Sequence, residues 1–253
     1  MDWLTAAATL VAALLIQVGT NLANDYYDFV NGADTPDRLG PPRITQAGLA
    51  EPAAVRRAAL TVLALAGVVG VYLVEIGGWP ILTIGLLSLM SALAYTGGPW
   101  PLASHGLGEV FVFLFFGVIA VNGTVWLQTG EASTLALFAS LPVACLATAI
   151  LVINNLRDIP TDARAGKRTL AVRLGAAATR GEYLLLVAVA FLCALLLSRL
   201  AGPRVLLTLG ALPLAFVEAR ALPWRTGAEL NRSLAGTARL HLVFGVLLAI
   251  GLA

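Results

Sequence analysis

Charged residues are scarce in this chain of 253 residues: they make up 12% of it, whereas a typical soluble domain carries roughly 25%. Hydrophobic residues make up 59%. A soluble fold of this length has too little interior to hide so much apolar surface, so the composition argues against a soluble domain. It predicts a protein that crosses a membrane several times.

Cysteine and net charge are low as well. The two cysteines, Cys145 and Cys193, lie in apolar runs without the spacing of a metal site, so a disulfide framework is not expected. The formal net charge of +2 is too small to indicate nucleic-acid binding. The function is therefore sought in the membrane and not among nucleic-acid partners.

Long apolar runs dominate the chain. Eight stretches have about 20 apolar residues each, the length that crosses a bilayer as a helix. Gly77-Gly78 predicts a tight turn between the second and third stretches, and Gly202-Pro203 predicts another between the sixth and seventh. The predicted fold is an all-α, polytopic membrane helical bundle. Its spans are approximately 3–24, 53–76, 79–97, 107–128, 132–153, 182–200, 203–222 and 236–253.

The basic residues predict the orientation of these spans. Alternating the sides places 14 of the 16 lysines and arginines on one face, with only Arg199 and Arg204 opposite. By the positive-inside rule that face is cytoplasmic, in a multi-pass protein of the inner or plasma membrane. Met1 then starts on the outer side, directly before a helix, so we expect one helix to be missing ahead of it.

Two polar clusters follow helices on the predicted cytoplasmic face. Asn21, Asn24, Asp25 and Asp28 are separated by steps of three and four, so they share one helical face at the end of the first span. The second cluster, at the end of the fifth span, consists of Asn154, Asn155, Arg157, Asp158 and Asp162. Pro160 is expected to disturb the helix between its two aspartates.

These carboxylates need a counter-charge. Two of them one helical turn apart repel by about 3 kcal/mol at an effective dielectric constant of about 20. If the two clusters face each other, a bound cation removes the conflict, and oxygen ligands without histidine or cysteine favour Mg²⁺. Basic loops beside the acids suit a phosphate or diphosphate. Capping or solvation of the acids is the simpler alternative, and two matched clusters on one face make it less favoured.

At these residues the chain resembles the UbiA-type membrane prenyltransferases, and within them the 1,4-dihydroxy-2-naphthoate polyprenyltransferases of menaquinone biosynthesis. The resemblance covers nearly the whole chain, as a single UbiA-like domain over 1–253. It rests on NLANDYYDFVNGADTPDRLGPPRITQAGL (21–49), AYTGGPWP (94–101), GLGEVFVFLFFG (106–117) and NNLRDIPTDARAGKRTLAVRLG (154–175).

The resemblance implies a central cavity within nine helices, where two aspartate motifs face each other over Mg²⁺ and an isoprenoid diphosphate. Carried over by position, the metal-binding residues are Asn24, Asp25, Asp28, Asp158 and Asp162, and the four aspartates are catalytic. The substrate-binding residues are Asn21, Asn24, Arg43, Tyr95, Asn154, Asn155, Arg157 and Lys167.

The implied reaction is transfer of a polyprenyl group from the diphosphate to an aromatic acceptor, dihydroxynaphthoate, with loss of its carboxylate as CO₂ and formation of demethylmenaquinone. Membrane lipid is the surrounding partner. The chain departs from the family in having eight expected spans, without a counterpart of the opening helix. Some other branches have a lysine after the pair Tyr95-Thr96, where this chain has Gly97-Gly98.

Two alternatives stay open at this point. The first is a prenyltransferase for another aromatic or lipid acceptor. The second is a membrane cation carrier, although the outer halves of the spans hold few polar residues for an ion path. His105 and Glu109, four residues apart, are interpreted as packing or capping residues, with acceptor binding as the alternative.

Overall fold

The chain is predominantly helical in the part that the structure, a computed structural model, describes: residues 1–34 and 38–253. The long helices are α1 (Trp3–Val30), α2 (Pro52–Ala94), α5 (Thr134–Arg164), α6 (Leu170–Ala201) and α8 (Leu230–Leu252). The shorter elements are η1 (Ala103–His105), α3 (Gly108–Val112), η2 (Phe113–Ile119), α4 (Ala120–Thr129), η3 (Pro203–Ala211), α7 (Leu212–Ala221), η4 (Leu222–Trp224) and η5 (Gly227–Glu229).

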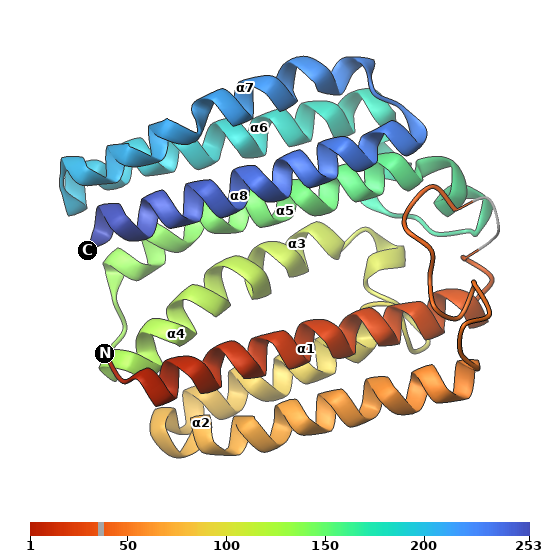
Figure 1. Cartoon of the computed structure of the whole chain (residues 1–253), viewed down its shortest axis with the longest axis horizontal. Coiled ribbons are helices and arrows are strands. Elements are labelled where there is room, and N and C mark those ends of the chain that lie inside the picture. Colours follow the sequence, from red (N-terminus) through yellow and green to blue (C-terminus); the bar gives the residue numbers. More distant parts are fainter. Residues whose placement is uncertain (35–37) are drawn as a thin grey trace.

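The eight predicted spans are found as helices. Within the described residues, seven helical stretches are long and apolar enough to cross a membrane. One of them, α2, has 43 residues and accounts for both the second and the third predicted span. α2 folds back on itself at Gly78, whose φ of 68° lies in the region that favours glycine (Figure 1). The indole of Trp126 donates a hydrogen bond to the carbonyl of Gly77 beside this turn, at 2.9 Å. The all-α membrane bundle is confirmed.

The bundle has two halves with α3, η2 and α4 between them. In Figure 1, α1 and the two arms of α2 lie on one side, and α5 to α8 lie on the other. The main hydrophobic core belongs to the second half, where Tyr183 on α6 and Phe244 on α8 are fully buried near α5. Both chain termini lie at the end of the bundle opposite the ends of α1 and α5.

Helix starts follow the expected capping chemistry. Ser133 accepts a hydrogen bond from the amide of Ala136 at the start of α5, and Thr169 accepts one from the amide of Val172 at the start of α6. Such caps satisfy amides that have no partner within the helix.

One local prediction needs correction, and two of the confirmed spans contain segments that depart from regular α-helix geometry. Pro160 does not break the helix: α5 continues through it to Arg164, so Asp158 and Asp162 remain one turn apart. The span predicted at 107–128 contains a π-helical segment, η2, where Gly117 lies against Ala144 so closely that a Cβ at 117 would be 2.1 Å from the Cβ of Ala144. The span predicted at 203–222 begins as the 3₁₀ helix η3. These geometries depend on packing between helices, which apolar runs do not encode.

Candidate active site

The two acidic clusters are joined at one end of the bundle. Lys167, which follows α5, places its Nζ 2.7 Å from Oδ1 of Asp28 at the end of α1. Nη2 of Arg43 lies 3.5 Å from Oδ2 of the same aspartate. The Asp162 carboxylate interacts electrostatically with Lys167, Asp158 and Asp28. Residues more than 130 positions apart in the chain therefore form one charged site.

Asp25, in the first cluster, accepts hydrogen bonds from backbone amides. Its two carboxylate oxygens accept hydrogen bonds from the amides of Ile44 and Thr45, at 2.9 and 3.0 Å, and the residue is 4% exposed. Asn24 accepts a hydrogen bond from the hydroxyl of Thr96 at 2.7 Å. Asp25 thus orders the loop that carries Arg43, in addition to any role in ligand binding.

Asn21 is the most exposed member of the first cluster, and its backbone carbonyl accepts a hydrogen bond from Nη1 of Arg43 at 3.4 Å. Arg43 also approaches Asp34, whose carboxylate pairs with Arg38. Burial raises the pKa of Asp34, and the two neighbouring arginines oppose that rise.

Arg157 is the centre of the second cluster. Its guanidinium donates to both carboxylate oxygens of Asp158 at 2.7 and 2.6 Å, to Oδ1 of Asn154 at 2.8 Å and to Oδ1 of Asn231 at 2.7 Å. Arg157 is 2% exposed. With its three nitrogens engaged, Arg157 holds neighbouring side chains in place. Its predicted contact with a diphosphate stays a prediction.

Asn155 and Glu109 form a separate buried pair. Nδ2 of Asn155 donates to Oε1 of Glu109 at 2.8 Å, and both residues are buried. His105 bonds the carbonyl of Pro101 through Nδ1 at 2.7 Å and stacks on Trp100. These contacts agree with packing roles for His105 and Glu109. The predicted substrate-binding role of Asn155 stays a prediction.

The donor set is suited to a hard cation. Its candidate ligands are carboxylate and amide oxygens, which Mg²⁺ prefers. Within residues 1–34 and 38–253, no group of three or more histidine, cysteine, aspartate or glutamate side chains is assembled closely enough to hold a metal by itself. Asp28 is instead paired with Lys167 and Arg43, and Asp158 with Arg157, so the residues fit an ion that arrives together with an anionic substrate.

An apolar cavity of about 510 Å³ lies between α1, both arms of α2 and the segment from α3 to α4. Tyr95, at the end of α2, lines it, and the Tyr95 hydroxyl is close enough to Gly108 that a Cβ there would be 2.9 Å away. The rest of the lining is mostly aliphatic and aromatic, and includes Ile16, Leu73, Leu89, Phe115 and Leu127. The space suits a long hydrocarbon chain.

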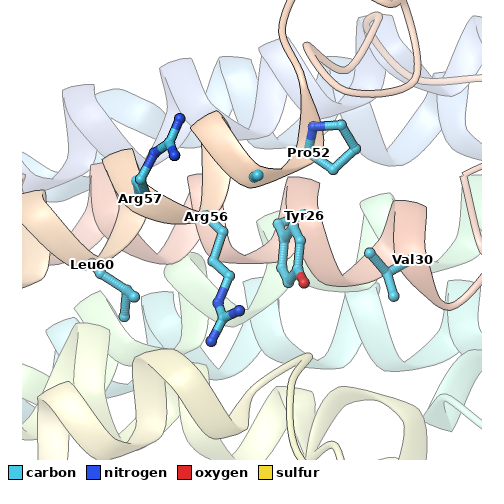
Figure 2. A pocket seen from close by; sticks show the side chains of 7 residues that line it. Tyr26, Val30, Pro52, Arg56, Arg57 and Leu60 are labelled. Carbon is cyan, nitrogen blue, oxygen red and sulfur yellow. The ribbon is translucent and has the colours of Figure 1, made fainter.

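A second cavity of about 510 Å³ lies between the end of α1 and the start of α2. Figure 2 shows Arg56 running beside the ring of Tyr26, with its guanidinium carbon 5.9 Å from the ring centroid, while Arg57 points to the other side. None of its lining residues belongs to the predicted site.

Sequence reasoning missed several residues of the site. Asn231 and Thr96 hydrogen-bond to predicted site residues, yet neither belongs to a polar cluster in the sequence. Gly40 packs on Arg157: a Cβ there would lie 2.9 Å from Nη2. Gly97 lies under Tyr27, where a Cβ would be 2.5 Å from the ring. The only signal for the glycines was their presence in the motif stretches.

Comparison with known proteins identifies the family of this chain. Residues 1–245 match the UbiA prenyltransferase family. The chain belongs to this family. Among its UbiA relatives, a 1,4-dihydroxy-2-naphthoate octaprenyltransferase of Mycobacterium tuberculosis is 41% identical over 252 residues, which cover 99% of this chain and 86% of that protein.

A second relative with the same name, from Bacillus subtilis, is 32% identical over 100% of this chain and 82% of its own length. UbiA prenyltransferase domain-containing protein 1 of Danio rerio is also 32% identical, over 100% of this chain and 74% of its own length. The predicted family is confirmed. The chain is a multi-pass membrane enzyme of the aromatic prenyltransferase class, and the cation-carrier alternative finds no support in these relatives.

Proposed function

We propose that the chain transfers a polyprenyl group from an isoprenoid diphosphate to 1,4-dihydroxy-2-naphthoate, with loss of CO₂, to give demethylmenaquinol, the reduced form of demethylmenaquinone. The observation that carries the proposal is the charged site on Asp28, where α1 and α5 converge, together with the apolar cavity that Tyr95 lines. Relatives named for this reaction, at 32 to 41% identity over nearly the whole chain, support the choice of acceptor.

The charged site would bind the diphosphate. Lys167 and Arg43 pair with Asp28 in the structure, and an incoming diphosphate offers both cations a stronger partner. Asp28 is then free to act as a ligand. Asn24, Asp25, Asp28, Asp158 and Asp162 would hold Mg²⁺, and the bound ion would stabilise negative charge on the diphosphate oxygens.

The reaction itself needs few protein groups. The allylic C–O bond breaks, and its electron pair leaves with the diphosphate, whose charge Lys167 and Arg43 would stabilise. The electron-rich ring carbon that bears the carboxylate forms the new C–C bond. The carboxylate then departs as CO₂, and its bonding electrons restore the aromatic ring. No protein nucleophile or base is required.

The apolar cavity would hold the prenyl chain and keep water from the allylic cation, which water would convert to an alcohol. The distribution of basic residues further supports a site that faces the cytoplasm at a plasma or inner membrane. Other aromatic or lipid acceptors would use the same donor chemistry, so the acceptor is the point that needs direct measurement.

The deciding experiment is an assay with purified protein, geranylgeranyl or longer diphosphate, Mg²⁺ and a panel of acceptors. We expect prenylated naphthoquinol and CO₂ with dihydroxynaphthoate, little product with other acceptors, and loss of turnover in EDTA that added Mg²⁺ restores. Preference for a different acceptor would overturn the proposed substrate, and full turnover in EDTA would overturn the magnesium requirement.

A further inference from the structure

The segment 38–45, which carries Arg43, is held from both halves of the bundle. On the side of the first half, the Asp25 carboxylate accepts hydrogen bonds from the amides of Ile44 and Thr45. On the side of the second half, the carbonyl of Leu39 accepts a hydrogen bond from Nδ2 of Asn231, at 2.8 Å. In Figure 1 this loop curls over the end of the bundle where α1 and α5 end and α8 begins.

Asn231 is the second residue of α8, and its side-chain amide group makes two different hydrogen bonds. Its Oδ1 accepts a hydrogen bond from Nη1 of Arg157 at 2.7 Å, while its Nδ2 donates to Leu39. Only a side chain with both an acceptor and a donor can make the two hydrogen bonds at once. An ionised aspartate has no donor, and a leucine has neither group. Gly40 packs directly on the same guanidinium, so the segment and Arg157 fit against each other.

Both ends of this arrangement lead to the site of reaction. Arg157 continues to Asp158 and Asn154, and the segment continues to Arg43, whose Nη2 lies 3.5 Å from Asp28. A change at Asn231 therefore reaches the cations and acids of both clusters through Arg157 and the segment 38–45.

We propose that Asn231 is a positioning residue: through Leu39 it holds the segment 38–45 so that Arg43 meets the diphosphate, and through Arg157 it holds Asp158. The contact with a diphosphate rests on the proposed function. The position of the segment 38–45 does not depend on the proposed function. The position of the segment and the contact with a diphosphate can therefore be tested separately.

The two contacts can be separated by substitution. Asn231→Asp keeps the acceptor for Arg157 and loses the donor to Leu39, whereas Asn231→Leu loses both. Asn122→Leu is the matched control, because Asn122 is a half-buried asparagine on α4 that bonds only the carbonyl of Val118 within its own helical stretch in the contacts of the described residues.

The first readout needs no substrate: the rate at which trypsin cleaves the purified full-length protein after Arg38 and Arg43. We expect roughly tenfold faster cleavage in both Asn231 variants, as the loss of one buried hydrogen bond suggests, and no change in Asn122→Leu. Cleavage at the wild-type rate in Asn231→Asp would overturn the proposal.

The second readout is steady-state kinetics with the prenyl diphosphate. We expect Asn231→Asp to raise KM for the diphosphate roughly tenfold with little change in kcat, and Asn231→Leu to lower kcat as well, because Arg157 then loses a partner. Faster cleavage with an unchanged KM would refute the positioning role. Absence of turnover in the wild-type protein would instead refute the proposed function and leave the cleavage result to decide the position of the segment.

Discussion

The two halves of the bundle differ in how tightly they are packed. In the most apolar 18-residue stretch of α5, 67% of the residues are buried within the protein, whereas in the corresponding stretch of α1 17% are buried. The main core, with Tyr183 and Phe244, surrounds α5, while the core beside α1 is a small cluster that includes Ala12, Leu73 and Leu127. Part of the space beside α1 is taken by the apolar cavity.

This difference suggests a division of roles. The half from α5 to α8 is a rigid support that fixes the second acidic cluster, and the half with α1 and α2 leaves room for a hydrocarbon chain. Charged side chains are concentrated where the halves meet, at Asp28 and Lys167. Substitutions in the half from α5 to α8 should therefore affect folding, and those in the half with α1 and α2 should affect substrate choice.

The largest effect is expected where the halves meet. Asp28→Ala removes the carboxylate that both Lys167 and Arg43 contact, and we expect turnover with prenyl diphosphate to fall roughly 100- to 1,000-fold. Turnover per folded molecule is the measurement. Glu75→Ala, which changes an exposed carboxylate on α2, is the control. Near-normal turnover of Asp28→Ala would show that the charged site is not the reaction site.

The second prediction concerns the free energy of unfolding. Phe244→Ala removes a fully buried ring that packs against Phe191, and we expect a loss of about 3–5 kcal/mol. Phe115→Ala removes a half-buried ring that lines the apolar cavity and stacks on Phe111, and we expect a smaller loss of about 1–2 kcal/mol. Equilibrium unfolding in mixed micelles compares them. Equal losses would mean that the two halves are packed alike.

The third prediction concerns the length of the prenyl chain. A Cβ at Gly85 has no neighbour within 4 Å and Gly85 lines the apolar cavity, so Gly85→Leu should partly fill the cavity without a clash. We expect KM to rise about tenfold for long-chain diphosphates, since one leucine displaces roughly two methylene contacts, and to stay unchanged for short ones. Gly245→Leu on α8, where a Cβ also meets open space, is the control and should alter neither. An equal rise in KM for all prenyl diphosphates would show that the prenyl chain binds outside this cavity.

The smallest effect is expected at a helix end. Ser133→Ala removes the cap of α5, which should lower the free energy of unfolding by about 1 kcal/mol with no change in KM. Ser198→Ala removes a hydroxyl that donates a hydrogen bond to the carbonyl of Leu195 within α6, and it should be close to neutral in the same unfolding experiment. A change in KM on loss of the Ser133 cap would show that α5 is less rigid than its burial suggests.

Much of the architecture was predictable because apolar runs and turn residues are local signals. The turn at Gly77-Gly78, the spans and the acidic ends of α1 and α5 are all found where the sequence places them. Contacts between distant segments were not predictable. For example, Asp25 accepts hydrogen bonds from the amides of Ile44 and Thr45, and Asn231 donates one to the carbonyl of Leu39. These contacts depend on backbone positions that residue type and spacing do not determine. The roles of the predicted ligands remain predictions.

Gly97 also bears on how the chain can change over time. A Cβ at 97 would lie 2.5 Å from the Tyr27 ring and 2.7 Å from the backbone carbonyl oxygen of Leu93. A smaller residue at 27 removes the first of these clashes and leaves the second. Glycine should therefore persist at 97 even where residue 27 changes, and a library that randomises both positions should yield active combinations that keep glycine at 97.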